Sequence, residues 1–391
     1  MELMPGYKRS DVGVIPDDWD AKPLGEIGDS LIGLTYRPSE VRKYGTLVLR
    51  SSNVQNGTLC FDDNVFVAAD IPDRIMVRPG DILVCVRNGS RDLIGKSALI
   101  DERAVGMTFG AFMGVFRSEY GQFLRHVFQS GIFKKQINEH LGATINQITN
   151  KSLNSFKVPL PPTDEERTEI ARALSDVDAL LASLDQVIAK KRDLKQATMQ
   201  QLLTGETRLP GFSGNWEMMH LGEIAHIKTG SRNNEDKVED GQYPFFVRSE
   251  FVERINSYSH DCEAILVPGE GRIGDIFHYI NGRFDVHQRV YAITKFSPGI
   301  SGRFVYFYLS KNFGAWAMQN TVKATVDSLR LPTFQTFEMR LPPTLDEQIA
   351  IANALSDIDG ELCTLENRRD KINNLKQAMM QELLTGKTRL V

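Results

Sequence analysis

The sequence predicts an α+β protein in which two β-rich globular domains are joined by two long antiparallel coiled-coil helices with pseudo-two-fold symmetry. Three observations support this fold class. A segment of about 50 residues that begins at Leu160 recurs at Leu341, at a constant offset of 181 (341 − 160). Within both copies, apolar residues alternate in steps of four and three, as in a coiled coil. Before each copy, short apolar runs alternate with glycine-rich polar segments, which is typical of strands and turns.

Both copies carry signals for the two ends of a helix. Thr163 with Glu166 fits the S/T-x-x-E capping box directly after two prolines, and the second copy repeats this pattern. Gly205 and Gly386 stand where a helix C-cap is expected. We therefore expect one helix of about 40 residues, about 60 Å long, in each copy.

The apolar positions of the two helices form a narrow seam. The predicted seam residues are Ile170, Leu174, Val177, Leu181, Leu184, Ile188, Ile351, Leu355, Ile358, Leu362 and Leu365. Two amphipathic helices in an ordinary core are the alternative, but such helices have a broader apolar face. The seam favours a spacer made of the two helices packed on each other.

The duplication also covers the segments before the helices. Trp19 followed by Leu24-Gly-Glu-Ile recurs as Trp216 followed by Leu221-Gly-Glu-Ile. The predicted division is a first domain over 1–159, a helix over 160–205, a second domain over 206–340 and a helix over 341–391. A short segment leads from the end of the first helix to Trp216. No such segment follows the second helix, but the N-terminus has a similar segment that leads to Trp19. Joining the termini would therefore make a ring of two equivalent halves.

Composition bounds the class of protein. The chain has 391 residues, enough for two or more domains, and 41% of them are apolar. It has no apolar run long enough for a membrane span and no signal core near its start, so we expect a cytoplasmic location and no membrane partner. The four cysteines form no CxxC pair. A net charge of −4 argues against binding nucleic acid by bulk electrostatics alone.

Several resemblances to enzyme motifs fail on context. Gly269 to Gly274 fits G-x-G-x-x-G, but the following residues are expected to be extended, so we interpret the segment as a hairpin turn. Gly89 to Ser97 ends in Gly-Lys-Ser with the wrong spacing for a P-loop. The seven histidines have no metal-binding spacing. We expect no catalytic residue and no metal site.

Matched polar loops remain as candidate binding residues, because their side chains are types that bond base edges and phosphates. The candidates are Arg50, Ser51, Asn53, Arg87, Asn88, Ser90, Arg91 and Lys96 in the first half, and Arg248, Ser249, Glu250, Glu270, Arg272, Gln288 and Arg289 in the second. For any single residue, a solvated turn or an internal salt bridge is the ordinary alternative. The hypothesis depends on their matched placement.

The framing segments resemble those of the specificity subunits of type I restriction-modification enzymes. The features that carry the resemblance are the two LPP-T-x-x-E…ALSD-x-D…LKQA-x-MQ-x-LLTG-x-TRL segments and the Trp-(x4)-Leu-Gly-Glu-Ile entries. The resemblance implies two target recognition domains, each reading half of a gapped double-stranded DNA target. It also implies two methyltransferase subunits docked on the helices, which use S-adenosylmethionine to methylate adenine N6. Restriction subunits would add ATP- and Mg-dependent translocation and cleavage. The chain itself would bind no cofactor and would not be an enzyme.

Groove geometry sets an expectation for the target. Two domains on one face of the duplex lie about 10 to 10.5 bp apart. With about 4 bp read by each domain, about 6 bp stay unread. The partner must also flip an adenine in each half-site.

Three other functions stay open at the level of sequence. One is a stand-alone sequence-specific DNA binder, such as a repressor or an anti-restriction decoy. Another is an interaction rod with no role in nucleic-acid binding, which the acidic composition would suit. The weakest is an enzyme with an atypical site.

Overall fold

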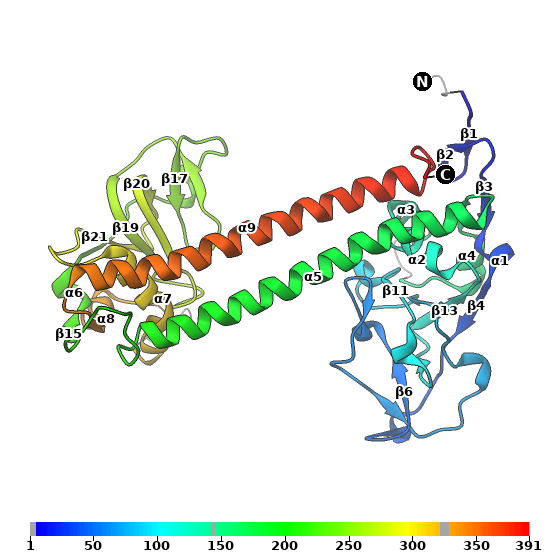
Figure 1. Cartoon of the computed structure of the whole chain (residues 1–391), viewed down its shortest axis with the longest axis horizontal. Helices are drawn as coiled ribbons and strands as arrows, with labels where there is room; N and C mark the ends of the chain where they lie inside the picture. Colours follow the sequence, from blue (N-terminus) through cyan, green and yellow to red (C-terminus); the bar gives the residue numbers. More distant parts are fainter. Residues whose placement is uncertain (1–4, 142–145, 321–327, 391) are drawn as a thin grey trace. The chain divides into compact units, whose positions relative to one another are not determined.

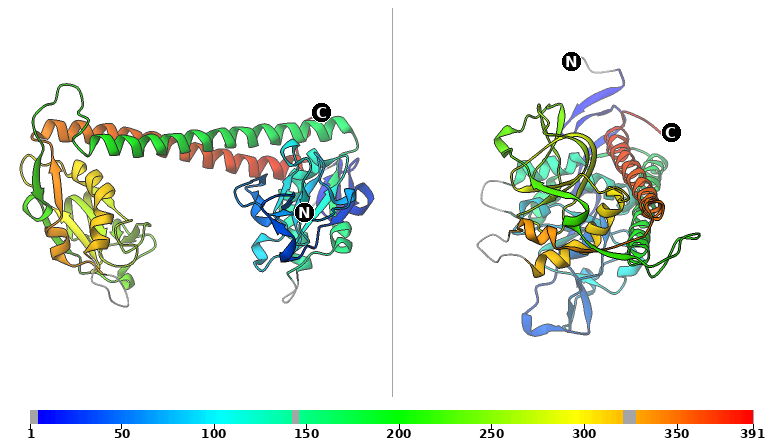
Figure 2. Two further views of the ribbon diagram at one scale, coloured as in Figure 1. Left: turned by 90° about the horizontal axis from the view of Figure 1, so that it is seen from below. Right: turned by 90° about the vertical axis from the view of Figure 1, so that its left-hand side faces the viewer.

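The computed structural model describes residues 5–141, 146–320 and 328–390 (Figure 1). The chain divides into two compact units: unit 1 comprises Met1–Leu184 and Arg368–Val391, and unit 2 comprises Asp185–Asn367. The two long helices are α5 (Asp164–Leu202) and α9 (Leu345–Leu383), each 39 residues long. Both are unbroken (Figure 2). Each unit therefore contains a globular part and one portion of both helices.

Unit 1 contains a four-stranded antiparallel sheet in the order β11-β10-β13-β4 and a second small sheet in the order β12-β6-β9-β5. Buried side chains of β10 and β13 supply much of the core between the helices and these sheets. The strands are β1 Tyr7–Ser10, β2 Gly13–Pro16, β3 Asp20–Pro23, β4 Asp29–Ile32, β5 Val41–Arg42, β6 Thr46–Leu49, β7 Val54–Gln55, β8 Thr58–Leu59, β9 Phe66–Val67, β10 Ile82–Cys85, β11 Ser97–Leu99, β12 Thr108–Phe109, β13 Met113–Arg117 and β14 Lys157–Leu160. The short helices are α1 Leu24–Ile27, α2 Gly121–Gln129, α3 Gly131–His140 and α4 Asn150–Ser155.

Unit 2 is built on one six-stranded mixed sheet in the order β16-β21-β19-β20-β17-β18, with a separate β15-β22 pair. Helix α7 packs on β19 and β20 and buries a cluster of phenylalanines. The strands are β15 Glu217–His220, β16 His226–Thr229, β17 Tyr243–Phe246, β18 Glu253–Ile255, β19 His260–Pro268, β20 His278–Val286, β21 Val290–Thr294 and β22 Glu338–Leu341. The helices are α6 Leu221–Ile224, α7 Gly302–Gln319 and α8 Leu331–Gln335.

Local predictions were correct at the level of elements and less so at their boundaries. The sequence pattern over 120–141 predicts one helix. In the structure this helix is interrupted at Ser130, whose backbone is extended and whose hydroxyl donates to the Val127 carbonyl. The Leu- and Phe-rich segments 153–160 and 331–341 are predicted from the sequence to be strand-like. In the structure the first part of each segment is helical, in α4 and α8, and a strand follows. The strand expected directly after Gly274 begins only at His278, so the glycine motif does lie in the turn of the β19-β20 hairpin.

The long helices pair antiparallel, and ion pairs fix their register. In unit 2, Lys191 pairs with Glu361 and Lys195 pairs with Asp359 at 2.6 Å, so the partner's number falls as the chain advances. In the sequence, Lys191 follows Ile188 where the apolar seam would continue, so it is predicted to interrupt the seam. Instead it extends the contact between the helices as an ion pair. The α+β class with two paired antiparallel helices is confirmed.

The same ion pair occurs in both units because the repeat is reciprocal. Lys195 and Asp359 meet in unit 2, and the residues at the matching positions of the other copies, Lys376 and Asp178, meet at 2.6 Å in unit 1. Each copy of the segment thus contributes its lysine to one unit and its aspartate to the other. The sequence therefore encodes the same pairing between the two helices in both units.

The start of α5 corrects the capping-box prediction in part. The Thr163 hydroxyl accepts a hydrogen bond from the Glu166 amide at 3.3 Å, as expected for an N-cap. The buried Glu166 carboxylate turns instead toward the domain, where it accepts the indole N–H of Trp19 at 3.2 Å and pairs with Arg389. Arg389 also bonds Asp18 at 3.1 Å. Near its C-terminus the chain therefore closes unit 1 against the entry segment.

The start of α9 repeats this arrangement in unit 2. Glu347 is buried and pairs with Arg208, which matches Arg389 in the repeat, and the Arg208 guanidinium lies 6.0 Å from the ring of Trp216. In contrast to Trp19, the indole N–H of Trp216 is buried without a hydrogen-bond partner among the described residues.

Candidate nucleic-acid interface

In unit 1, five chain segments meet where β6 and β10 end and β13 begins; we call this the strand-end junction. Two isolated β-bridges connect its segments: Leu34 pairs with Gly110, and Arg87 pairs with Gln147. The segments are 33–36, 49–52, 86–88, 109–112 and 146–148. Gly33 is required here, because a Cβ would lie 2.3 Å from the Gly110 carbonyl oxygen.

Unit 2 builds the same junction from its own segments. Arg232 pairs with His287, and Glu270 pairs with Ser328, in the same parallel and antiparallel senses as in unit 1. A Cβ on Gly230 would lie 1.9 Å from the Val286 carbonyl oxygen. The segments are 230–233, 246–249, 269–271, 286–289 and 328–330.

Backbone hydrogen bonds fix which positions of the two junctions correspond. The Phe112 carbonyl accepts the Val86 amide at 3.1 Å, and the Arg289 carbonyl accepts the Gly269 amide at 2.9 Å. Phe112 therefore corresponds to Arg289. Since Val86 corresponds to Gly269, the residues that follow them, Arg87 and Glu270, also correspond.

In the sequence, Arg50-Ser51 and Arg248-Ser249 each follow a short apolar run and look like a match, but the same reasoning shows that they do not correspond. Gly110 donates to the carbonyl of Leu49 at 3.0 Å, and the corresponding His287 donates to Phe246 at 3.0 Å. Arg50 therefore corresponds to the buried Val247, not to Arg248. The apparent match in the sequence is displaced by one residue, which reverses the face on which a strand residue lies.

The junction of unit 1 is lined by a hollow of about 540 Å³, with Arg50, Ser51 and Phe112 on its walls. Arg50 pairs with Asp63 at 2.7 Å. Arg87 is exposed, and its guanidinium lies 5.2 Å from the ring centre of Phe112, a cation–π contact. Phe112 is itself 60% exposed. The structure thus brings Arg50, Ser51 and Arg87 together on one accessible surface.

Other candidates of unit 1 have structural partners. Asn53 is completely buried, and its amide bonds backbone carbonyls of its own loop, including Cys60 at 3.0 Å, so it is inaccessible and its prediction as a DNA contact is wrong. Arg91 donates to the carbonyl of Leu141 at 3.0 Å and so stabilises the C-terminal end of α3. Asn88 accepts the Ser90 amide at 2.9 Å and forms a turn.

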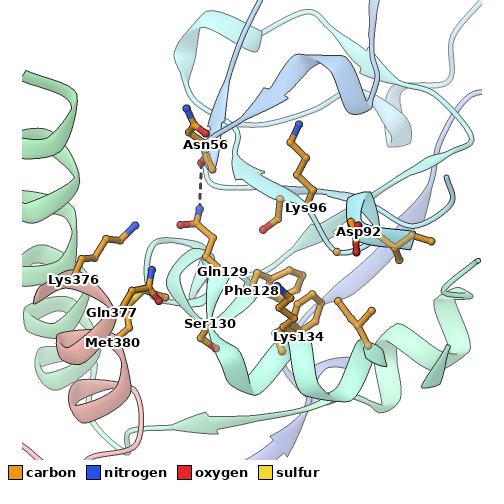
Figure 3. A pocket seen from close by; sticks show the side chains of 16 residues that line it. Asn56, Asp92, Lys96, Phe128, Gln129, Ser130, Lys134, Lys376, Gln377 and Met380 are labelled. Atoms are coloured by element: carbon orange, nitrogen blue, oxygen red, sulfur yellow. Dashed lines mark hydrogen bonds between the residues drawn. The ribbon is translucent and has the colours of Figure 1, made fainter. Parts of the chain in front are cut away.

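Lys96 lies at a separate pocket of about 320 Å³ (Figure 3). This pocket has an apolar floor that includes Phe128 and Phe133, and the ammonium groups of Lys134 and Lys376 also line it. The Lys96 ammonium is 3.5 Å from the carbonyl oxygen of Ser51, so it connects this pocket to the junction.

The junction of unit 2 is occupied by a charged cluster. Glu270, 19% exposed at its side chain, pairs with Arg289 at 2.9 Å and with Arg248 at 3.2 Å. Gln288 is exposed and donates to the side chain of Asn233. Glu270, Gln288 and Arg289 line a hollow of about 350 Å³.

The remaining candidates of unit 2 lie beside this cluster. Glu250 and Arg272 are exposed and pair with each other at 3.2 Å. The Ser249 hydroxyl bonds the Phe251 carbonyl within its own turn at 2.8 Å.

A buried polar network centred on Asp285 contacts the junction of unit 2 through Arg232. The carboxylate of Asp285 is buried and accepts hydrogen bonds from the hydroxyls of Ser257 and Ser259, at 2.9 and 2.8 Å, and from Arg232 at 3.2 Å. Burial alone would raise the pKa of Asp285, but these donors outweigh it and hold the pKa below its usual value. Asp285 is therefore an anchored anion that fixes Arg232 at the bridge with His287.

Two participants in the junctions carried no signal in the sequence. Phe112 follows a glycine and an alanine in what reads as an ordinary turn, and Asp63 is one of many loop acids. Their positions depend on which segments meet, which only the tertiary structure defines.

The predicted seam residues differ in packing: Ile170 and Leu174 belong to the core of unit 1, and Ile351 and Leu355 belong to the core of unit 2. Ile170, Leu174, Leu184, Ile188, Ile351, Leu355 and Leu362 are buried, and Val177, Leu181, Ile358 and Leu365 are half-buried.

Within the described ranges, no group of three or more His, Cys, Asp or Glu side chains is arranged to hold a metal ion. Among the same residues, none of the helices has the length and apolar character that crossing a membrane requires.

Comparison with known proteins defines the class of this chain. The model of the type I restriction modification DNA specificity domain matches it twice, over residues 16–190 and 213–377. The chain belongs to this family and contains two copies of its domain. It is a DNA sequence-specificity protein of the type I restriction-modification systems.

Individual relatives span nearly the whole chain. It is 27% identical to the EcoKI specificity subunit of Escherichia coli, over 96% of this chain and 90% of that protein. It is 24% identical to the StySPI specificity subunit of Salmonella potsdam, over 96% of this chain and 90% of that protein. The crystal structure of the S subunit of a type I system from M. genitalium superposes with a TM-score of 0.67 at 16% identity and covers 98% of both chains.

Proposed function

We propose that this chain reads a gapped double-stranded DNA target, one half-site with the junction of each unit, and docks two methyltransferase subunits. Those subunits would methylate adenine N6 with S-adenosylmethionine. Restriction subunits would add cleavage that uses ATP and Mg. The observation that carries the proposal is that one backbone junction occurs twice with unlike exposed side chains, such as Phe112 in unit 1 and Arg289 in unit 2. Two similar backbone scaffolds that carry different exposed side chains are what we expect for recognition of a DNA target whose two halves differ in sequence.

Major-groove recognition agrees with the residue types at the junctions. Arginine forks bond guanine, and glutamate accepts from the amino group of cytosine. Each junction lies at strand ends rather than within a core, so its side chains are free to approach base edges. A net charge of −4 leaves few phosphate contacts to this chain alone, which favours partners that supply them.

Matched exposed leucines support the docking of two identical partners. Leu194 of α5 lies in unit 2 and Leu375 of α9 lies in unit 1; they occupy matching positions of the repeat, and both are about half exposed. Each begins the same tetrapeptide, Leu-Lys-Gln-Ala. A surface that occurs once in each unit fits two copies of one subunit. We therefore place a methyltransferase contact at each leucine.

The docking proposal is tested by counting partners. Replacing Leu194 by glutamate should remove one of the two bound methyltransferase subunits, and adding Leu375→Glu should remove both, as measured by light scattering of the purified complex. The exposed Cys363 on α9, changed to glutamate, serves as the control. Retention of two partners by the double variant would rule out this contact.

The experiment that tests the function is long-read mapping of methylated bases in a host that carries this chain with its methyltransferase partner. A gapped motif with N6-methyladenine in both halves is expected, and it should disappear when this chain is deleted. Persistence of every methylated motif after deletion would exclude the role. Specific DNA binding without any dependent methylation would favour a stand-alone DNA-binding protein.

A further inference from the structure

The two junctions can be compared position by position, because their backbones correspond. At one pair of positions unit 1 has Arg87 and unit 2 has Glu270; at the other, unit 1 has Phe112 and unit 2 has Arg289. Since the shared backbone bonds hold both scaffolds alike, these side chains are among those that distinguish one junction from the other. They are therefore residues through which the two half-sites can differ.

In unit 1 the corresponding side chains are an aromatic ring and a cation in contact with it. Phe112 exposes 60% of its surface at the junction, beside the apolar side chains of Leu34 and Met113 that also line the hollow. An apolar side chain in the major groove contacts the methyl group of thymine. The guanidinium of Arg87, 5.2 Å from the ring centre, has no hydrogen-bond acceptor among the described residues, so its N–H groups can bond the O6 and N7 atoms of guanine.

In unit 2 the corresponding side chains are an acid and a base bonded to each other. Glu270 is mostly covered and bonds two guanidinium groups, those of Arg289 and Arg248. Both arginines keep about half of their side-chain surface exposed, 57% and 44%. A carboxylate between two guanidinium groups restricts their rotamers before any ligand arrives, which lowers the entropy lost on binding.

We propose that unit 1 reads a thymine through Phe112 and a guanine through Arg87, whereas unit 2 reads guanine through Arg289 and Arg248, with Glu270 as their positioning residue. This inference rests on the proposed function and specifies the bases that each half-site contains. Half-site 1 has a T·A pair and a G·C pair at the contacted positions. Half-site 2 is contacted at G·C pairs.

The test is selection from a randomised duplex library by the full chain in complex with its methyltransferase subunit. In Phe112→Ala, the preference for one thymine of half-site 1 should fall about tenfold, while half-site 2 stays unchanged. In Arg289→Ala, the preference for one guanine of half-site 2 should fall by a similar factor, while half-site 1 stays unchanged.

Matched controls separate reading from stability. Arg283 is an exposed arginine of unit 2 that pairs with Asp261 at 2.9 Å, as Arg289 pairs with Glu270, but it lies within β20 and away from the junction. Arg283→Ala should leave all base preferences unchanged. Tyr44 is an exposed aromatic residue before β6, and Tyr44→Ala serves the same purpose for Phe112.

The positioning role of Glu270 has its own readout. Glu270→Ala should weaken the guanine preference of half-site 2 and leave the melting temperature of the complex within the range of the controls. Glu270→Gln, which still accepts one hydrogen bond from an arginine, should restore most of that preference.

The outcomes distinguish the two proposals. If the wild-type complex selects no gapped motif, the proposed function fails. If it selects a motif but Phe112→Ala and Arg289→Ala both leave every base preference intact, the function stands and this inference is overturned. The inference is also overturned if half-site 1 contains no thymine at a selected position or half-site 2 contains no guanine.

Discussion

At the scale of single residues, the two entry tryptophans occupy matching sequence positions but have different hydrogen bonding. Trp19 donates to the buried carboxylate of Glu166, whereas the N–H of Trp216 has no partner among the described residues. Trp19→Phe should lower the free energy of unfolding by about 2 kcal/mol, because a hydrogen bond to a charged group is lost. Trp216→Phe should cost clearly less. Chemical denaturation of both variants measures the difference, and equal losses would contradict the role assigned to Glu166.

His126 should make the stability of unit 1 depend on pH. Burial, and then the charge of Arg125, lower its pKa to about 3; Asp178 opposes this shift, and Lys376 adds to it. The unfolded chain therefore takes up the proton first as pH falls, so stability that is fully present above about pH 6.5 is lost progressively toward pH 3. Between pH 7.5 and 5 the wild type should lose about 2 kcal/mol more than His126→Gln. Replacing the exposed His140 by glutamine should leave the wild-type pH profile of thermal unfolding in place.

The sequence selected candidate residues by type, and the structure shows that some of them are exposed whereas others have structural partners. Arg87 and Arg289 were selected as arginines in polar loops, and both are exposed at the junctions. Asn53 and Arg91 were selected on the same grounds, yet their polar groups satisfy backbone atoms of their own unit. The sequence does not distinguish these cases, because the partners are distant in the chain and are brought close only by folding.

At the scale of elements, several predicted seam positions of α5 and α9 are buried. Leu362 is buried, whereas its neighbour Cys363 is exposed. Leu362→Asp should destabilise unit 2 by about 3 kcal/mol or more, since it removes a buried side chain and places a charge in an apolar contact. Cys363→Asp should change the free energy of unfolding by no more than about 0.5 kcal/mol. Similar effects of the two changes in urea titrations would show that the seam contributes little.

Elements with strong periodicity and marked ends were predicted well, while elements that depend on tertiary contacts were not. The long helices follow from the seam and from their end signals, and the hairpin of β10 and β11 follows from an apolar run, a polar loop and a second run. The break at Ser130 follows no comparable pattern. The one-residue displacement of Arg248 could be found only from the hydrogen bonds between strands, because both alignments place an arginine after an apolar run.

At the scale of the whole molecule, helix length is expected to set the unread gap of the DNA target. Inserting one heptad after Ala189 in α5 and one at the matching level of α9, after Leu365, adds about 10 Å, which equals about three base pairs. Methylation mapping should then find both half-sites unchanged and the gap longer. The same insertion in α5 alone should disrupt the reciprocal ion pairs and abolish methylation. An unchanged gap in the double insertion would exclude a measuring role for the helices.

The division of unit 1 between the two ends of the chain has a consequence for the order of folding during synthesis. Unit 2 is encoded by one continuous stretch, Asp185–Asn367, whereas unit 1 requires residues 368–391 as well as the first 184. The unit that leaves the ribosome first is therefore the last to be completed. Until Arg389 has been made, the buried Glu166 lacks its cation, and Trp19 lacks the residue that covers it. A nascent chain that stops between Asn367 and Arg389 would thus carry a finished unit 2 and an open unit 1, so the first residues of the chain stay incompletely packed until the end of α9 and Arg389 have been synthesised.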